Sequence, residues 1–167
     1  MLKNLELLRG LQVHKMSGEA DSKNEGQKIA IVRVRGLTGI KHPIDDTLNK
    51  LRLYRKNYCV VVPKNSVYMG MVKKVKDYVT WGEVSEETYK TLLDERKEEY
   101  KDRVSDSKGK INYAKFSDID GKRIKKFFRL NSPRKGYGRK GIKTSFTNGG
   151  ALDYRGDKIN DLIMRMI

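Results

Sequence analysis

The stretch Ile29–Ala30–Ile31–Val32–Arg33–Val34–Arg35–Gly36 decides the fold. It is rich in β-branched residues, which favour extended backbone. Its second half alternates, so that Val32 and Val34 fall on one face and Arg33 and Arg35 on the other. We therefore predict a strand over 29–35 that packs one face against a core and turns its arginine face outward.

Helix and strand patterns alternate downstream of this strand. A helix is expected to begin near Pro43, because proline suits the first helical turn. Its apolar stripe at i, i+4 and i+7 consists of Ile44, Leu48 and Leu51. Residues 58–62 form an apolar strand, and Asn65 or Ser66 caps a second helix that we expect to end at Trp81–Gly82. A third strand is expected at 126–130, and it completes a β-α-β-α-β order.

The remaining segments differ in composition from this core. Residues 1–28 are expected to form a flexible N-terminal extension, because residues 17–28 have the polar, glycine-containing composition of a linker. Residues 29–82 form the β-α-β-α part of the core. Residues 83–124 form an acidic helical insertion and linker, with a helix that starts at Ser85. Residues 125–167 add the third strand, a basic glycine-rich loop and a short C-terminal helix that complete the same domain.

The charge of the chain points to a polyanionic partner. The 167 residues include 37 Lys and Arg against 21 Asp and Glu, a net charge of +16. The charge is segregated: residues 83–106 carry a net −4, and residues 108–143 carry thirteen bases against two acids. Such a field favours nucleic acid first and an anionic membrane surface second.

Composition also excludes several classes of protein. The longest apolar run, Cys59–Val62, is too short to span a bilayer. A single cysteine excludes an internal disulfide framework, and one Cys with two His cannot form a structural zinc site. His14 and His42 are poorly placed for a nucleophile–base pair, and Asp45–Asp46 is explained by the dipole of the first helix. We therefore expect no catalytic residues, no metal and no cofactor.

The basic loop over 134–143 is the strongest candidate for a binding surface. Gly136–Tyr137–Gly138–Arg139–Lys140–Gly141 spells G-x-G-x-x-G, but a dinucleotide site needs a strand before this string and a helix after it. Pro133 precedes the string, and Gly149–Gly150 follows too closely for a crossover helix. The alternatives are that residues 134–143 form a mobile basic loop that contacts RNA phosphates, or that they form an ordinary solvated surface loop.

A second candidate surface is the arginine face of the sheet. Arg33, Arg35, Arg129 and Phe127 share one face if the first and third strands are neighbours, and such a face stacks bases and holds phosphates. The alternative is a solvated charged face. For Lys73, Lys74 and Lys76 the alternative to RNA contact is the solvated side of a helix, and for His42 it is a turn. The predicted RNA-binding residues are Arg33, Arg35, Lys41, His42, Arg55, Lys64, Lys73, Lys74, Arg129, Arg134, Lys135, Gly136, Arg139, Lys140 and Lys143.

Several motifs of the chain, in their order and spacing, carry a family resemblance. They are Val32–Gly36, Thr47–Leu48, Cys59–Pro63, Met71–Val72, Tyr78–Val79, Phe128–Gly136, Gly149–Gly150 and Ile159–Leu162. Together they resemble the L-thirty family of large-subunit ribosomal proteins, in the longer archaeal form that is related to eukaryotic L-seven. The family's loop more usually has two adjacent glycines where this chain has Arg134–Lys135–Gly136.

The resemblance implies both a fold and a function. The implied fold is α+β, similar to the ferredoxin-like fold, with a small sheet covered by helices on one face. The implied function is that of a structural constituent of the large (50S) ribosomal subunit, in the cytoplasm, which binds large-subunit rRNA near the 5S rRNA region. 5S rRNA and neighbouring ribosomal proteins are further expected partners, whereas a membrane, a homo-oligomer and catalysis are not expected. The alternative is a free-standing RNA-binding regulatory protein on the same fold.

Overall fold

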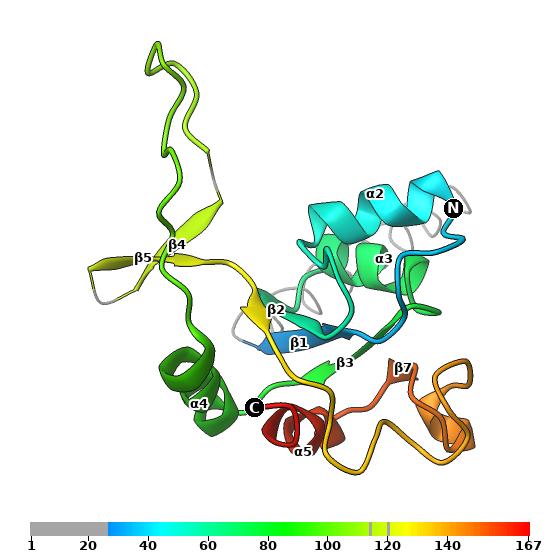
Figure 1. The fold of residues 1–167 in the computed structure, drawn as a ribbon. Coiled ribbons are helices and arrows are strands. Elements are labelled where there is room, and N and C mark those ends of the chain that lie inside the picture. The colour runs from blue at the N-terminus through cyan, green and yellow to red at the C-terminus, as the bar shows by residue number, and fades with distance from the viewer. Residues whose placement is uncertain (1–26, 114, 120) are drawn as a thin grey trace, which may run out of the picture.

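The computed structural model describes residues 27–113, 115–119 and 121–167, and nearly all of the predicted N-terminal extension therefore lies outside the described residues. The centre of the fold is a five-stranded mixed sheet (Figure 1). Its strand order is β6 (Phe128–Arg129), β2 (Tyr58–Pro63), β1 (Lys28–Arg33), β3 (Val79–Glu83) and β7 (Asp153–Tyr154). β1 is antiparallel to both β2 and β3, and β7 is parallel to β3.

Two helices cover one face of the sheet. α2 (His42–Lys50) has Pro43 in its first turn, as expected, and α3 (Ser66–Lys74) is capped by Asn65, whose side chain accepts a hydrogen bond from the Tyr68 backbone N–H at 2.9 Å. This local chemistry explains why both helix starts were predictable. The buried side chains between sheet and helices include Ile29, Ile31, Leu48, Leu51, Val60, Val72 and Val75.

The opposite face of the sheet is also covered. α5 (Lys158–Met164) and α4 (Glu86–Arg96) lie on the side of the sheet away from α2 and α3 (Figure 1). The second core on this face consists of Ala30, Val32, Cys59, Leu92, Phe128, Leu130, Ile159, Leu162, Ile163 and Met166. The α+β class and the β-α-β-α-β order are confirmed, but helices cover both faces rather than one. The C-terminal residues supply the second layer by contacts that are distant in sequence.

The third strand of the core is β3, not the segment at 126–130. Val75 and Val79 stand four residues apart and extend the stripe of α3, although the helix ends at Lys74 and the chain turns into β3. Gly82, expected to end a helix, instead lies in the strand where another part of the backbone passes closely. A Cβ built at Gly82 would stand 2.1 Å from the Gly156 carbonyl oxygen. The predicted strand at 126–130 is reduced to β6, which pairs with β2 at the edge of the sheet.

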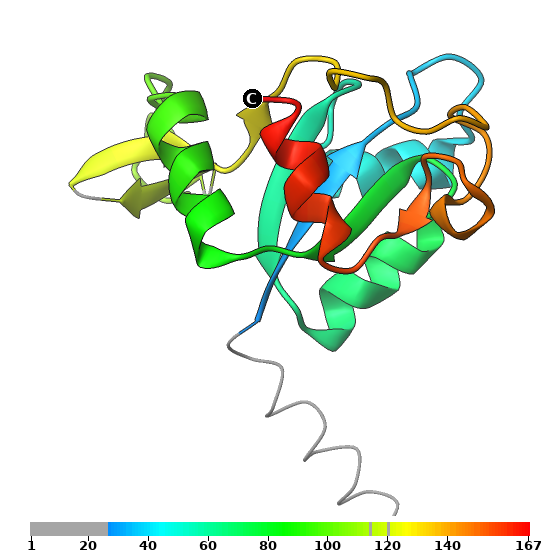
Figure 2. The same ribbon diagram turned by 90° about the horizontal axis from the view of Figure 1, so that it is seen from below.

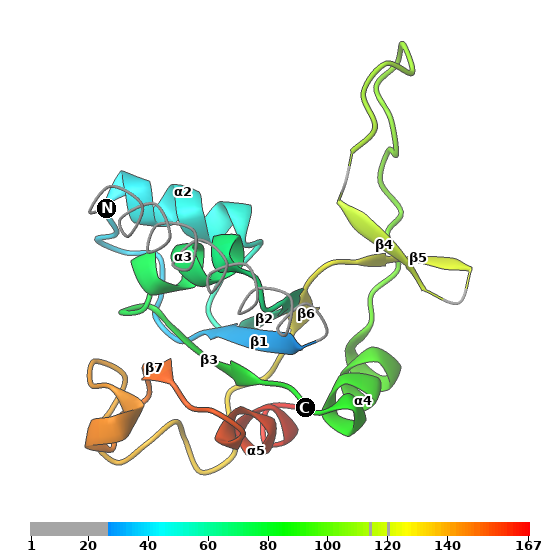
Figure 3. The same ribbon diagram turned by 180° about the vertical axis from the view of Figure 1, so that it is seen from behind.

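The predicted helical insertion is helical only in its first part. α4 is capped by Ser85, as expected, and is followed by an antiparallel hairpin of β4 (Phe116–Ile119) and β5 (Lys122–Lys125). We call residues 97–125 the arm. Figure 3 shows the described residues of the arm projecting away from the body of the protein.

Candidate nucleic-acid interface

Four connections of the sheet meet at one end of the molecule, which we call the loop end. They are residues 34–41, 51–57, 75–78 and 130–150. The backbone N–H of Val34 donates to the Tyr78 carbonyl at 3.0 Å, and that of Asn57 donates to the Arg33 carbonyl at 2.8 Å. The Tyr137 hydroxyl donates to the Asn57 side chain, and Tyr137 also packs against Val34. Figure 2 shows the connection after β1 and the segment after β6 at this same end.

The loop end is strongly cationic. Its four connections contain eleven Lys and Arg and a single acid, Asp77. Nine of the eleven side chains are exposed, and Arg35 and Arg52 are half-buried. The eleven are Arg35, Lys41, Arg52, Arg55, Lys56, Lys76, Arg134, Lys135, Arg139, Lys140 and Lys143. The antiparallel topology therefore collects positive charge that is dispersed along the sequence.

Most of the predicted binding residues lie at or beside this end. Those within the four connections are Arg35, Lys41, Arg55, Arg134, Lys135, Gly136, Arg139, Lys140 and Lys143. His42 is the exposed first residue of α2, directly after one of these connections. Lys73 and Lys74 are exposed in the last turn of α3, directly before another. Their contact with RNA stays a prediction.

Arg33 does not lie on an outer face, and this expectation was wrong. Its side chain is 0% exposed. The guanidinium donates to the carbonyls of Leu53 at 2.6 Å, Gly36 at 2.9 Å and Arg35 at 3.0 Å. Burial lowers its pKa. The alternation of Arg33 with valines suggested a sheet with one wet face, but both faces of β1 are covered, and Arg33 joins two connections of the loop end from inside.

The proposed arginine face with Phe127 is also absent from the described structure. β6 pairs with β2, and Phe127 stacks on Tyr58 with ring centroids 5.1 Å apart. Tyr54 packs edge-on against both rings and is 42% exposed. Aromatic surface therefore reaches the loop end through Tyr54, which the sequence reasoning did not single out.

Arg129 and Lys64 have acidic partners. Arg129 forms an ion pair with Glu98 at the base of the arm, and Lys125 contacts the same carboxylate at 3.0 Å. These hydrogen bonds, that of Arg129 above all, hold the pKa of Glu98 below its usual value. Lys64 follows β2 at the end of the sheet opposite the loop end and pairs with Glu83 at 2.9 Å. Neither side chain belongs to the group of cations at the loop end.

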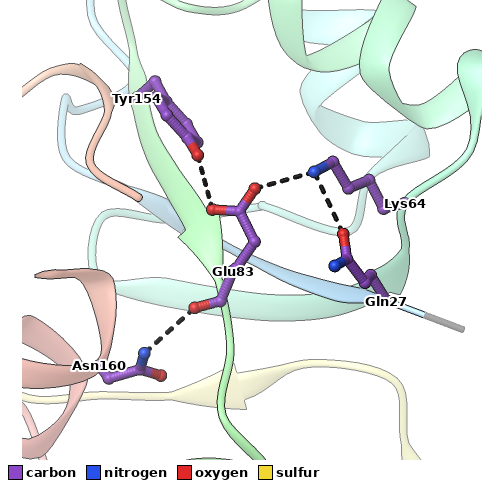
Figure 4. A network of polar contacts seen from close by, with 5 residues as sticks. All are labelled: Gln27, Lys64, Glu83, Tyr154 and Asn160. Atoms are coloured by element: carbon purple, nitrogen blue, oxygen red, sulfur yellow. Dashed lines mark hydrogen bonds and ion pairs between the residues drawn. The ribbon is translucent and has the colours of Figure 1, made fainter. Parts of the chain in front are cut away.

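A polar network closes the opposite end of the sheet, and we call its residues the far end: Gln27, Lys64, Glu83, Tyr154 and Asn160 (Figure 4). Lys64 donates to Gln27 at 3.3 Å as well as to Glu83, and the Tyr154 hydroxyl donates to Glu83 at 2.8 Å. The Asn160 amide donates to the Glu83 carbonyl at 3.1 Å. The network ties β3 to β7, α5 and the end of β2.

The basic loop is held by hydrogen bonds in both of its parts. Residues 134–138 are anchored: Arg165 donates to the carbonyls of Arg134 at 3.1 Å and Gly136 at 3.0 Å. A Cβ built at Gly138 would stand 2.7 Å from the Gly150 carbonyl oxygen, so close packing requires this glycine. Residues 139–143 are exposed, and the Lys140 backbone N–H donates to the Gly149 carbonyl at 3.2 Å. The structure thus explains Gly138 by contact with neighbouring backbone, not by the phosphate turn of a dinucleotide site.

Further cations near the loop end escaped the sequence reasoning. Arg155, Lys158 and Arg165 approach the loop from β7 and α5 and line one cavity with it. Their sequence neighbours include Asp157 and Asp161, so no run of basic charge marked them. Arg52 and Lys56 lie in the same connection as Arg55, and counting every cation in that connection would have identified them.

The described part of the chain has neither a membrane-spanning helix nor a cluster of metal-ligating side chains. None of its helices has the length and apolar character that a membrane crossing requires. Among the same residues, no three His, Cys, Asp or Glu side chains cluster as metal ligands would. Cys59 is buried, which raises the pKa of its thiol to about 12.

Comparison with known proteins identifies the family. Residues 29–79 match the family model described as ribosomal protein L30p/L7e. The chain is 46% identical over 151 residues to large ribosomal subunit protein uL30 of Nanoarchaeum equitans, a match that covers 83% of this chain and 97% of the relative. It is 44% identical to uL30 of Methanococcus vannielii over 83% of this chain and 98% of the relative. The uL30 of Thermoplasma volcanium is 42% identical over 83% of this chain and 92% of its own length. Because such similarity extends over nearly the whole length of these relatives, the chain belongs to the uL30 family of large ribosomal subunit proteins.

Proposed function

We propose that this protein is a structural, non-enzymatic constituent of the large ribosomal subunit, in the cytoplasm, and that its loop end binds large-subunit rRNA. The observation that carries the proposal is the gathering of eleven Lys and Arg with a single acid on four neighbouring connections. Phosphate neutralisation by such side chains supplies most of the affinity of proteins for nucleic acid. The family assignment supports the same conclusion.

The finer proposal is that the protein joins two parts of the subunit, including the region near 5S rRNA and neighbouring ribosomal proteins. The loop end supports one contact and the arm supports a second, because the arm projects from the body (Figure 3). The arm carries its own basic residues and an exposed apolar side chain, Ile111, which is 60% exposed. A protein with two such surfaces binds two segments that are separated in space.

The electrostatic part of the proposal is tested by salt. The binding constant for large-subunit rRNA should fall by about 0.7–0.9 log units per log unit of salt for each phosphate that is neutralised. With roughly six to ten contacts the dependence is steep. A flat salt dependence, measured by filter binding or fluorescence anisotropy, would contradict binding by the loop end.

The location of the contacts is tested by cross-linking in intact subunits. Photoactivatable groups placed at Lys56 and Lys140 should cross-link to rRNA, whereas a group at Lys90 on α4, outside the loop end, should not. Cross-links from Lys90 alone would overturn the assignment of the surface. The alternative of a free-standing regulator is tested by sedimentation: a ribosomal constituent is found almost entirely in large subunits, and a regulator is found largely outside them.

A further inference from the structure

A cavity of about 540 Å³ lies where the basic loop meets η1 (Phe146–Asn148) and α5. Five cationic side chains line it, together with one carboxylate, the backbone of Gly136 and Gly138, and the ring of Phe146. The charged lining residues are Lys135, Arg139, Arg155, Lys158, Arg165 and Asp161. The cavity therefore carries a net charge of +4 from its lining side chains.

Arg155 is fixed in the wall of this cavity. It is only 6% exposed. Its Nε donates to the Thr80 hydroxyl at 2.9 Å, and its Nη2 donates to the carbonyls of Ala151 at 3.1 Å and Tyr137 at 3.2 Å. Its guanidinium also lies 4.4 Å from the centroid of the Phe146 ring. Within the described residues its Nη1 has no hydrogen-bond partner, so one edge of a rigidly held guanidinium is left for a ligand.

The positive charge in the cavity is poorly compensated. Among the described residues, Asp161 is the only carboxylate that lines the cavity, and it already accepts a hydrogen bond from Arg165 at 3.1 Å. Arg155 has three hydrogen bonds to neutral oxygens and, in the part of the chain that the structure describes, none to a carboxylate. Burial first, and the charge of Arg165 second, lower the pKa of Arg155 to about 10. An anion bound between Arg155 and Arg165 would offset both the cost of burying the Arg155 charge and the repulsion between the two guanidinium groups.

We propose that this cavity binds one phosphate group of a nucleic-acid backbone, with Arg155 as its fixed anchor and Lys135, Arg139 and Lys158 at its rim. The rim side chains are exposed. Both neighbours of a bound phosphodiester in the polynucleotide chain therefore have room to leave the site. The inference rests on the proposed RNA-binding function and adds to it one defined phosphate position. Arginine suits such a site because its planar donors match phosphate oxygens.

The binding test uses the full chain with two probes, a single-stranded RNA hexamer and inorganic phosphate, and follows the Nε–H resonance of Arg155 by NMR. The hexamer should shift this resonance at concentrations that saturate binding, and inorganic phosphate should shift it only at much higher concentration. A hexamer that binds without moving the Arg155 resonance would overturn the cavity site and leave the proposed function standing. A shift with inorganic phosphate alone would assign the site to the free anion instead of a backbone phosphate. A protein that binds no RNA would overturn both proposals.

The mutational test compares two substitutions with the same change in charge. Lys158→Gln removes an exposed cation from the rim, and Lys90→Gln removes an exposed cation from α4. Lys158→Gln should reduce the salt slope of RNA binding by about 1, as expected for one lost phosphate contact, and Lys90→Gln should leave it unchanged. Equal slopes for the two variants would contradict the proposal. Neither side chain is buried, so both variants are expected to fold, and thermal unfolding checks this.

Discussion

The two ends of the sheet distribute charge in opposite ways. At the far end, Lys64 meets Glu83 at 2.9 Å, and the same carboxylate accepts a hydrogen bond from Tyr154 at 2.8 Å. At the loop end, eleven cations accompany one acid. Paired charges at the far end hold strands and helices together, whereas the excess at the loop end adds repulsion to the folded protein. A polyanion bound at the loop end would remove this repulsion, which explains why the excess of cations is confined to that end.

Two buried arginines hold the backbone of the loop end in place without cancelling its positive charge. Arg33, the last residue of β1, and Arg155, directly after β7, lie beside the loop end, and each donates to several neutral oxygens. Neutral acceptors satisfy the hydrogen-bond donors of a guanidinium without cancelling its charge. Both residues therefore order the backbone of the loop end and preserve its positive potential. A carboxylate acceptor in place of these neutral oxygens would also have ordered the backbone, but it would have cancelled part of the positive potential.

Removal of positive charge from the loop end should have the largest effect on rRNA binding. Replacement of Arg134, Lys135, Arg139 and Lys140 by Ser should weaken rRNA binding by about 100-fold and reduce the salt slope by up to about four phosphate equivalents. The free energy of unfolding should change by no more than about 0.5 kcal/mol for each substitution, because all four side chains are exposed. Binding assays and denaturant melts on the same samples give both quantities. Unchanged affinity would make the loop an ordinary surface turn.

The next test removes the internal support of the loop end. Arg33→Met keeps the length of the side chain and leaves the carbonyls of Leu53, Arg35 and Gly36 without this donor. The free energy of unfolding should fall by about 1–3 kcal/mol, the usual cost of buried polar groups left unpaired. Arg35→Met, at a half-buried position two residues later, serves as the matched control and should have the smaller effect. Equal melts for wild type and Arg33→Met would show that the hydrogen bonds of Arg33 contribute nothing to stability.

The smallest effect is expected at the far end. Burial raises the pKa of Glu83, but the hydrogen bonds from Lys64 and Tyr154 outweigh it and hold the pKa below its ordinary value. A lowered carboxylate pKa stabilises the folded protein above the unfolded pKa, and this contribution is lost as the pH falls through the folded pKa. Glu83→Gln should therefore reduce stability by up to about 1 kcal/mol at neutral pH, the usual range for a solvent-accessible pair.

The pH dependence makes this last prediction specific. Below about pH 4.5, near the ordinary pKa of a glutamate, the wild type should lose its advantage over Glu83→Gln. Glu95→Gln, an exposed position on α4, is the control and should show no such convergence. A stability difference that stays constant from pH 7 to pH 3 would contradict the role of the ionised carboxylate.

The part of the fold that was predictable depends on local chemistry. Asn65, Ser85 and Pro43 mark helix starts through contacts within a few residues, and these elements were correctly expected. β3 was missed because Val75 and Val79 satisfy a helical spacing as well as the turn and strand that they form. Local sequence does not distinguish these alternatives, and pairing with β1 decides between them.

The candidate site was predictable in its charge and not in its geometry. The basic composition of 134–143 identified part of the loop end, but Arg33 was misplaced because nothing near it in sequence shows that α2 and α3 cover its face of β1. Arg155, Lys158 and Arg165 were missed for a related reason. They approach the basic loop only because β7 pairs with β3 and α5 packs beneath the sheet.

The bonds of Arg33 have a consequence for variation in this protein. The guanidinium is held by main-chain carbonyls of residues 35, 36, 53 and 54, and every amino acid supplies a main-chain carbonyl. The exposed side chains of the two connections can therefore be exchanged without loss of the bonds that hold these connections together. At the loop end, the backbone conformation therefore does not depend on which side chains are exposed. One buried arginine maintains the conformation, and the exposed residues can change along with the binding partner.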